Sequence, residues 1–171
     1  VPNSALYAAY LALRQAGKGH DLKLFGARAV DSMRLEKGFL HWKADLITEF
    51  DPFETGLERF VKLDKGDFIG KTALRNRKAE TSYKKLVTLK VDANHAPAHG
   101  GASLMQGDTV VGTVTSGGWG HRVGQNLAYA FVDRDHASLG NSLKLDLCGD
   151  LIGAEVIAPS PYDPSHQRMR G

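Results

Sequence analysis

The sequence predicts an α+β protein, with a mainly helical first part followed by a small antiparallel β-barrel. Two observations support this fold class. Apolar residues recur at helical spacing in the first part of the 171-residue chain. From Thr81 onward, short alternating runs of apolar and polar residues are separated by glycine-containing turns, a pattern typical of small antiparallel barrels. We therefore expect two domains, residues 1–80 and 81–171, joined at the polar, charged stretch 77–83.

Two helices and a loop are expected at the start of the chain. Apolar residues at helical spacing predict a helix over residues 4–15, which Gly17 can end. A second helix is expected over residues 27–36, and Gly38 can end it because glycine adopts left-handed backbone angles without strain. The stretch 39–50 has no clean periodicity and is expected to be an ordered loop that carries aromatic side chains.

Short elements are expected in the rest of the first part. Pro52 suits the first turn of a short helix over residues 52–57. A weak alternation predicts a strand over residues 60–63, and Asp67 can cap a helical segment over residues 68–77. These elements contain too few strands to close a sheet, so the first part is expected to be the end of a larger α+β domain.

Six strands are expected in the second part. In the first of them, Val87, Leu89 and Val91 alternate with polar residues and should share one buried face. Gly107 lies in a predicted turn, and Gly149-Asp150 is predicted to be a two-residue hairpin turn. The predicted strands are residues 86–91, 102–105, 109–115, 126–132, 143–148 and 151–157.

Composition and charge argue against several classes of protein. Hydrophobic residues make up 42% and charged residues 24%, which is ordinary for a soluble globular protein. The net charge of +3 is small and mostly dispersed, so we expect no nucleic-acid partner. No uncharged run is long enough to cross a membrane, and we expect no membrane partner. The single cysteine, Cys148, fits a reducing compartment, which predicts a cytoplasmic location.

Metal binding and nucleophilic catalysis find little support in the residue pattern. The seven histidines are scattered, and no carboxylate or cysteine joins them at zinc spacing, so no metal site is expected. Ser116 lacks the preceding glycine of a nucleophile elbow. The glycines between 112 and 124 match no phosphate-binding spacing and predict a bulge and a wide turn. Trp119, His121 and Arg122 at that tip are candidates for contact with a ligand or a neighbouring domain.

The run from Arg34 to Trp42 is the most informative local feature. It brings Glu36, two cations, two aromatic residues and a glycine together where a helix should end. A carboxylate beside aromatic surface can hold a flat ligand with several N–H donors. An ordinary solvated helix end would have the same composition.

The C-terminal tail supplies a second candidate. Two prolines flank Tyr162-Asp163 and stiffen the chain there, which favours a tail that is docked rather than free. Tyr162 offers a flat face that could pack on an aromatic ligand. The alternative is a frayed terminus with no binding role.

Three stretches of the chain form a recognisable set because of their order and spacing. They are Gly26 to Gly38, Val61 to Leu74, and Gly112 to Gly118 followed by Leu127 to Ala130. Together they resemble the aminomethyltransferase (T-protein) family of the glycine cleavage system. The resemblance covers nearly the whole chain. Within that family, the run from Leu35 to Trp42 and the tail are most similar to the folate-binding C-terminal region of dimethylglycine and sarcosine dehydrogenases.

This resemblance implies a tetrahydrofolate site and a six-stranded Greek-key barrel behind the end of a folate-binding α+β domain. The glutamate of the family's Arg-Leu-Glu motif holds the pterin ring, and here that residue is Glu36. A tail tyrosine lies near the folate, and Tyr162 is the candidate. A basic residue before the Phe-Ile-Gly motif can meet the folate, and Lys65 is the nearest one. The family's catalytic aspartate lies upstream of anything in this chain, so no catalytic residue is expected here.

The function implied is tetrahydrofolate-dependent one-carbon transfer in an enzyme similar to dimethylglycine or sarcosine dehydrogenase. The chain begins Val1-Pro2 without a methionine, and we expect a fragment that has little activity by itself. Its expected partners are folate, an amine-derived one-carbon donor and the upstream half of the same protein, with FAD confined to a domain further upstream. Two alternatives remain: a fragment of a stand-alone glycine cleavage aminomethyltransferase, and a folate-fold module that binds or docks without catalysis.

Overall fold

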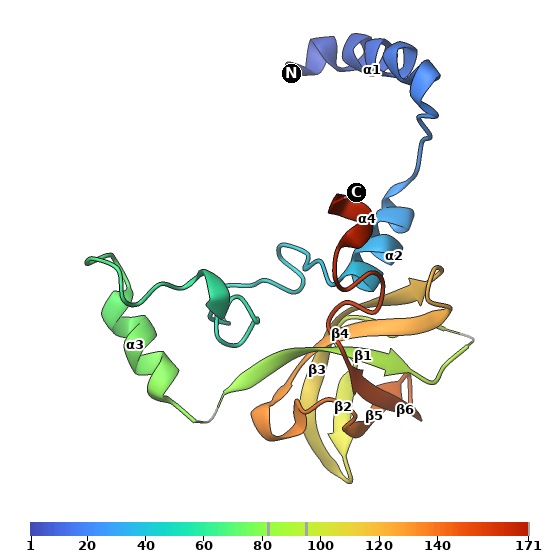
Figure 1. The fold of residues 1–171 in the computed structure, drawn as a ribbon. Coiled ribbons are helices and arrows are strands. Elements are labelled where there is room, and N and C mark those ends of the chain that lie inside the picture. The colour runs from blue at the N-terminus through green and yellow to red at the C-terminus, as the bar shows by residue number, and fades with distance from the viewer. Residues whose placement is uncertain (82, 95, 171) are drawn as a thin grey trace. The chain divides into compact units, whose positions relative to one another are not determined.

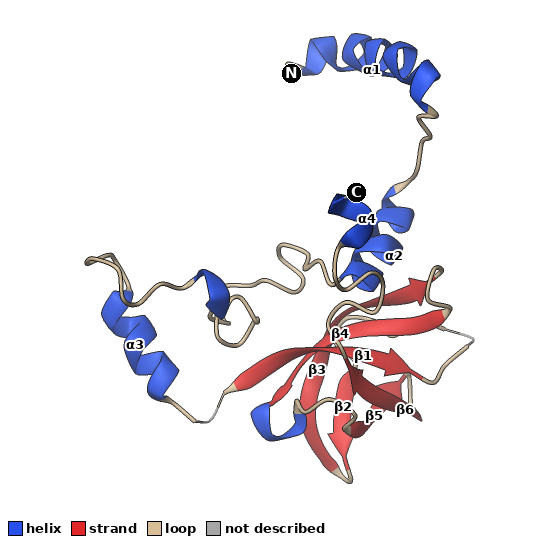
Figure 2. Cartoon of the chain, viewed as in Figure 1, coloured by secondary structure: helices blue, strands red, loops and turns tan. Residues whose placement is uncertain are grey.

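The computed structural model describes residues 1–81, 83–94 and 96–170 (Figure 1). It divides into two compact units, Val1–Val30 and Asp31–Gly171, which are described separately. Helices occupy the early part of the chain and a closed antiparallel barrel of six strands follows (Figure 2). This arrangement confirms the predicted α+β class and the predicted barrel.

The first unit contains one long helix. A 3-10 turn, Asn3–Ala5, leads into α1, Leu6–Ala16, which Gly17 ends as predicted. A second 3-10 turn, Gly17–His20, follows. No residue of α1 is buried, so its helical form rests on the intrinsic preference of its alanines and leucines rather than on a core within this unit.

Helix α2, Ala27–Lys37, begins where the chain carbonyl of Gly26 accepts hydrogen bonds from the N–H groups of Ala29 and Val30. It ends at Gly38, whose φ of +77° lies in the left-handed region, as its position in the sequence predicted. Only the last turn of α2 contains buried residues, Leu35 and Glu36.

The segment that follows α2 corrects two predictions. Residues 52–57 form turns rather than a helix. The Asp51 carboxylate accepts the N–H groups of Phe53 and Glu54, as a helix N-cap does. Gly56, however, has a left-handed φ of +74°, which ends the helical path after one turn. The predicted strand over 60–63 is also wrong, since a 3-10 turn, Glu58–Phe60, leads into irregular chain.

Helix α3 and a loop are close to their predicted places. α3, Lys71–Ala79, begins after Gly70, whose φ is +88°, and not at Asp67. The loop over residues 39–50 is irregular, as predicted, with one isolated bridge between Trp42 and Leu46.

The barrel closes in the order β1-β4-β3-β2-β5-β6, and β6 pairs with β1. Because β2, β3 and β4 are consecutive neighbours and β1 lies beside β4, this order contains a Greek key. Val87, Leu89 and Val91 point into the barrel core, as predicted. The strands are β1 (Lys84–Val91), β2 (Ser103–Gln106), β3 (Thr109–Gly120), β4 (Gln125–Asp133), β5 (Ser142–Leu147) and β6 (Asp150–Ile157).

The end of β3 and the β5–β6 turn differ from the prediction. β3 runs on to Gly120 because its glycines pair with β4, after a register shift between Val114 and Ser116. The β5–β6 turn is Cys148-Gly149, one residue earlier than predicted, and both residues have positive φ. That geometry matches the primed turns which suit the twist of paired strands.

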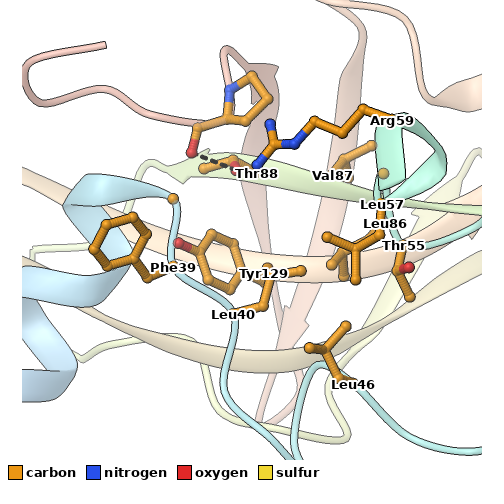
Figure 3. Close-up of a pocket in the computed structure, with 13 residues that line it drawn as sticks. Phe39, Leu40, Leu46, Thr55, Leu57, Arg59, Leu86, Val87, Thr88 and Tyr129 are labelled. Atoms are coloured by element: carbon orange, nitrogen blue, oxygen red, sulfur yellow. Dashed lines mark hydrogen bonds between the residues drawn. The ribbon is translucent and has the colours of Figure 1, made fainter. Parts of the chain in front are cut away.

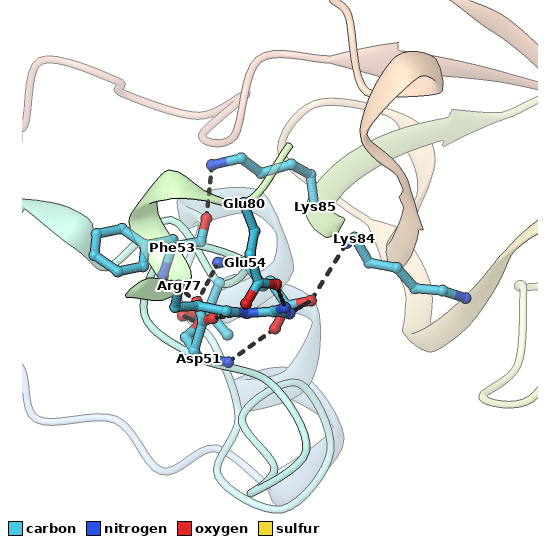
Figure 4. A network of polar contacts seen from close by, with 8 residues as sticks. Asp51, Phe53, Glu54, Arg77, Glu80, Lys84 and Lys85 are labelled. Atoms are coloured by element: carbon cyan, nitrogen blue, oxygen red, sulfur yellow. Dashed lines mark hydrogen bonds and ion pairs between the residues drawn. The ribbon is translucent and has the colours of Figure 1, made fainter. Parts of the chain in front are cut away.

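A charged network ties α3 and the turn at Asp51 to the start of β1 (Figure 4). Arg77 Nε lies 2.5 Å from Asp51 Oδ2, and Arg77 Nη2 lies 3.0 Å from Glu54 Oε1. The buried Glu54 also accepts the N–H of Lys84 on its carboxylate, and its chain carbonyl accepts the N–H of Leu86. The hydrogen bond that Arg77 donates to Asp51, helped by those to Glu54 and Glu80, raises the pKa of Arg77, so this link stays charged.

Candidate functional site

Glu36 lies in the last turn of α2 and is only 2% exposed. Its Oε1 atom accepts the backbone N–H groups of Arg122 at 2.5 Å and Val123 at 3.0 Å, in the turn that follows β3. Two donors from consecutive residues fix the orientation of the carboxylate. Glu36 is therefore no solvated helix end, which was the alternative that the sequence left open.

The glycines of β3 allow α2 to lie this close to the barrel. A Cβ at Gly118 would be 3.1 Å from Leu35 Cδ1, and a Cβ at Gly120 would be 3.0 Å from Glu36 Cγ. Both distances are shorter than ordinary van der Waals contact. The predicted bulge is present, but the glycines at the end of β3 serve mainly to bring Glu36 against the strand.

Tyr129 of β4 holds the C-terminal end of α2. Its hydroxyl is within hydrogen-bond distance of the Arg34 carbonyl at 3.1 Å and the Leu35 carbonyl at 3.0 Å. These two carbonyls also accept the N–H groups of Phe39 and Gly38 just beyond the helix. Burial raises the pKa of Tyr129, so its hydroxyl remains a neutral donor. The sequence signalled only an aromatic residue within an apolar strand and did not reveal this role.

Asp45 is fully buried between α2, the loop and the barrel. Its Oδ2 lies 2.6 Å from Arg34 Nη1 and accepts the His41 N–H at 2.8 Å. Its Oδ1 accepts the hydroxyls of Thr115 at 2.5 Å and Ser116 at 2.6 Å. Sequence reasoning missed Asp45 because the loop around it has no distinctive pattern. Ser116 serves here as a hydrogen-bond donor to a structural carboxylate.

The C-terminal tail is docked on the end of α2. The N–H of Tyr162 donates to the carbonyl of Glu36 at 2.9 Å, and Lys37 Nζ lies 2.9 Å from Asp163 Oδ2. A Cβ at Gly38 would lie 2.6 Å from the carbonyl oxygen of Pro159, so the tail needs a glycine there. These contacts exclude the frayed terminus and bring two predicted site residues, Glu36 and Tyr162, side by side in the chain fold.

Two more interactions complete this cluster. The hydrogen bond from Lys37 lowers the pKa of the Asp163 carboxyl and keeps it ionised. The guanidinium of Arg122 lies 5.8 Å from the centre of the Tyr162 ring, a distance typical of cation–π contacts. Arg122 thus touches Tyr162 with its side chain and Glu36 with its backbone.

Lys65 lies in an exposed turn. Its ammonium is 4.6 Å from the centre of the Phe68 ring, and its carbonyl accepts Lys71 Nζ at 2.5 Å. Within the described part of the chain, its recorded contacts are with these neighbours, and none joins it to Glu36 or Tyr162. A role for Lys65 at the folate stays a prediction.

A cavity of about 500 Å³ opens next to Gly38 and Phe39, beyond the end of α2 (Figure 3). Its walls are mainly apolar, and its polar side chains are those of Thr55, Arg59, Thr88 and Tyr129. Such a cavity suits a flat, mostly apolar body. The lining residues are Gly38, Phe39, Leu40, Leu46, Thr55, Gly56, Leu57, Arg59, Leu86, Val87, Thr88, Tyr129 and Pro159.

No three histidine, cysteine, aspartate or glutamate side chains among the described residues gather where they could hold one metal ion. None of the described helices is both long and apolar enough to cross a membrane.

Two family models match most of the chain. The model described as the GCVT N-terminal domain matches residues 1–65, and the glycine cleavage T-protein C-terminal barrel domain matches residues 84–163.

Relatives come from two kinds of enzyme. An aminomethyltransferase of Saccharopolyspora erythraea is 40% identical over 152 residues, which are 88% of this chain and 41% of that protein. The mitochondrial dimethylglycine dehydrogenase of Homo sapiens is 35% identical over 167 residues, which are 95% of this chain and 19% of that protein. The crystal structure of aminomethyltransferase T from Bartonella henselae aligns with a TM-score of 0.79 at 26% identity, over 92% of this chain and 44% of that one. The chain therefore spans less than half the length of these relatives.

Proposed function

We propose that this chain, which belongs to the glycine cleavage T-protein family, is a tetrahydrofolate-binding region of a one-carbon-transfer enzyme. The proposal rests mainly on the burial and hydrogen bonding of the Glu36 side chain. Its carboxylate is buried and its orientation is fixed by two backbone donors, and the docked tail joins the Tyr162 N–H to the Glu36 backbone carbonyl. This is the residue that the family motif identifies as the pterin contact.

The residues present fit a reduced folate. The amino-pyrimidine edge of a pterin presents N–H donors, and a carboxylate is the acceptor that matches them. In the described residues, Oε1 of Glu36 carries the recorded hydrogen bonds, which leaves Oε2 with acceptor capacity for such a ligand. The aromatic face of Tyr162 adds a surface on which a flat ring can pack. Since Glu36 is 2% exposed, the ligand must fit closely against that small exposed part.

The residues of this chain would bind tetrahydrofolate and orient its pterin ring. Tetrahydrofolate, when bound, supplies the nitrogen atoms that accept a one-carbon unit. Glu36 would fix the pterin edge and Tyr162 would cover the ring, so that positioning of the reactants contributes much of the rate. We propose that the family's catalytic aspartate and the amine-derived donor lie in the part of the fold that this chain does not span.

The branch of the family is part of the proposal. The run from Leu35 to Trp42 and the docked tail favour an enzyme similar to dimethylglycine or sarcosine dehydrogenase, with FAD in a separate upstream domain. A stand-alone aminomethyltransferase is the second candidate, favoured by the 40% identity to the Saccharopolyspora protein. A Gly-x-Gly-x-x-Gly flavin-binding segment in the upstream reading frame would decide for the first. The non-catalytic module would apply if the upstream part lacked an aspartate at the folate.

The proposed cellular location rests on one observation. The single cysteine favours the cytoplasm, whereas the name of the human dehydrogenase places that relative in mitochondria. Fluorescence microscopy of the tagged full-length protein in its own cells would decide between the two.

Replacing Glu36 by glutamine tests the proposed function. In the full-length protein, Glu36→Gln should weaken tetrahydrofolate binding by about 1–3 kcal/mol, because a charged acceptor becomes a neutral one. Calorimetric titration measures the affinity, and thermal unfolding checks that the variant is folded. Glu155→Gln, at an exposed position of β6, is the matched control and should bind normally.

Two outcomes of this titration would contradict the proposal. Unchanged affinity in a folded Glu36→Gln variant would remove Glu36 from the site. Tight binding by the 171-residue chain alone would show that no further part of the protein is needed to complete the pocket.

A further inference from the structure

We propose that Lys37 and Asp163 are positioning residues that hold Tyr162 in the folate site, between Glu36 and Arg122. This inference rests on the proposed function and adds to it the interaction that sets the place of the tail. Lys37 Nζ lies 2.9 Å from Asp163 Oδ2 and 2.5 Å from the Asp163 carbonyl oxygen. One ammonium therefore holds both the side chain and the backbone of the same tail residue.

This ion pair differs from surface ion pairs because it is largely shielded from water. Both side chains are only 10% exposed. Exposed ion pairs contribute little because water screens them and the side chains lose freedom. A shielded pair with charge-assisted hydrogen bonds is stronger and fixes geometry.

Asp163 has an unusual backbone conformation and several hydrogen bonds. Its φ is +46°, in the left-handed region that residues with a Cβ rarely adopt. Its Oδ1 accepts the N–H of Gln167, where the short helix α4, Gln167–Arg170, begins. Asp163 is thus the point at which the tail changes direction, and Lys37 holds the chain there.

The sequence positions make the pair act on the site. Lys37 directly follows Glu36, and Asp163 directly follows Tyr162. The ion pair therefore runs beside the hydrogen bond from the Tyr162 N–H to the Glu36 carbonyl at 2.9 Å. The ion pair and this hydrogen bond together fix both the position and the direction of the tail at Tyr162. With the backbone hydrogen bond alone, the tail could rotate about that one contact.

The Glu36 carboxylate and the Tyr162 ring are held by different contacts. The Glu36 carboxylate is fixed by the N–H groups of Arg122 and Val123, which do not involve the tail. Loss of the ion pair should therefore displace the Tyr162 ring and its contact with the Arg122 guanidinium while Glu36 keeps its orientation. The expected result is weaker tetrahydrofolate binding, with the Glu36 carboxylate still in its place.

Charge reversal in the full-length protein tests this arrangement. Lys37→Glu and Asp163→Lys should each weaken tetrahydrofolate binding about tenfold and speed hydrogen exchange at the tail amides. The double variant, which restores opposite charges, should recover most of the affinity and the protection. The exposed pair Lys23–Asp21, with side chains 78% and 83% exposed, is the control, and Lys23→Glu should change neither measurement.

A cycle with Tyr162→Ala separates positioning from a direct or general structural role. If Lys37 acts through Tyr162, then Lys37→Met should reduce affinity in the natural background and have no further effect when Tyr162 is already alanine. An equal loss in both backgrounds would overturn the inference, because Lys37 would then act on the ligand or on the fold by another route.

The other outcomes distinguish failure of this inference from failure of the proposed function. A freed tail with unchanged affinity, or a folded double variant that recovers nothing, would overturn the positioning role. If Glu36→Gln leaves affinity unchanged as well, the proposed function has failed. If only Glu36→Gln weakens binding, the function stands and the inference about Lys37 and Asp163 is wrong.

Discussion

Asp45 connects three parts of the fold through one buried carboxylate. Its buried carboxylate receives donors from Arg34 in α2, from the loop at His41, and from Thr115 and Ser116 on β3. A buried charge is tolerated only when it is paired and hydrogen-bonded, and here both oxygens have two partners. Arg34 is two residues before Glu36, so this cluster also supports the turn that carries the proposed pterin contact.

Removing the Asp45 carboxylate should be costly. Asp45→Ala is expected to lower the free energy of unfolding by about 3–5 kcal/mol, since it leaves Arg34 without its buried partner. Urea unfolding followed by circular dichroism measures the loss.

Asp31 offers a matched control for this substitution. It also pairs with Arg34, at 3.2 Å, but its side chain is 56% exposed. Asp31→Ala should cost less than about 1 kcal/mol. Similar losses for the two variants would mean that burial of Asp45 contributes little.

At the scale of elements, the site is a junction between the end of α2, the β3–β4 hairpin and the C-terminal tail. Small residues permit each approach: Gly118 and Gly120 toward α2, and Gly38 toward the tail. Polar groups then lock each approach, with the Tyr129 hydroxyl on the end of α2 and the Lys37–Asp163 pair on the tail.

Two glycines with similar positive φ values allow this packing to be measured. Gly38 and Gly56 have φ values of +77° and +74°, but a Cβ at Gly38 would lie 2.6 Å from the Pro159 carbonyl oxygen, whereas a Cβ at Gly56 meets no described atom within 4 Å. Gly56→Ala should therefore cost only the left-handed strain of about 1–2 kcal/mol. Gly38→Ala should cost more and release the tail.

Urea unfolding and hydrogen exchange at the tail amides check both variants. Equal losses of stability together with a protected tail in Gly38→Ala would show that the tail accommodates the methyl group. Faster hydrogen exchange at the tail amides only in Gly38→Ala would support the conclusion that the tail packs against Gly38.

For the whole molecule, the barrel is a closed unit with its own core. Its six strands pair in a ring, and the largest buried cluster is made of barrel residues and the loops between them. Leu35 belongs to a second, smaller cluster with Leu127 and Tyr129 on the outer face of β4. The first part of the chain therefore adds to a barrel that can close without it.

We expect a fragment of residues 81–171 to fold cooperatively but with lower stability than the whole chain. The strand ring supplies its core, while the loss of α2 leaves Leu127 and Tyr129 exposed. Circular dichroism during urea unfolding would show one sigmoidal transition at a lower midpoint. A fragment without a cooperative transition would count against the proposed domain boundary near residue 80.

The sequence by itself determined the class of fold, the positions of α2 and the six barrel strands, and the use of Gly38 as a helix end. These features follow from local periodicity and from backbone freedom, which neighbouring residues express directly. It also identified the family through motifs in a fixed order. The turn at residues 52–57 was missed because Asp51 and Pro52 start a helical turn, whereas Gly56 takes a left-handed φ of +74° and ends it at once.

Only the tertiary structure decided how the site is assembled. Glu36 and Arg122 are 86 residues apart in the chain, Lys37 and Asp163 are 126 apart, and Asp45 and Ser116 are 71 apart. Such pairs depend on which surfaces the closed barrel and its glycines bring together, and no local pattern encodes that. The sequence could place a carboxylate at the end of a helix, but burial by the hairpin and the tail turned it into an oriented acceptor.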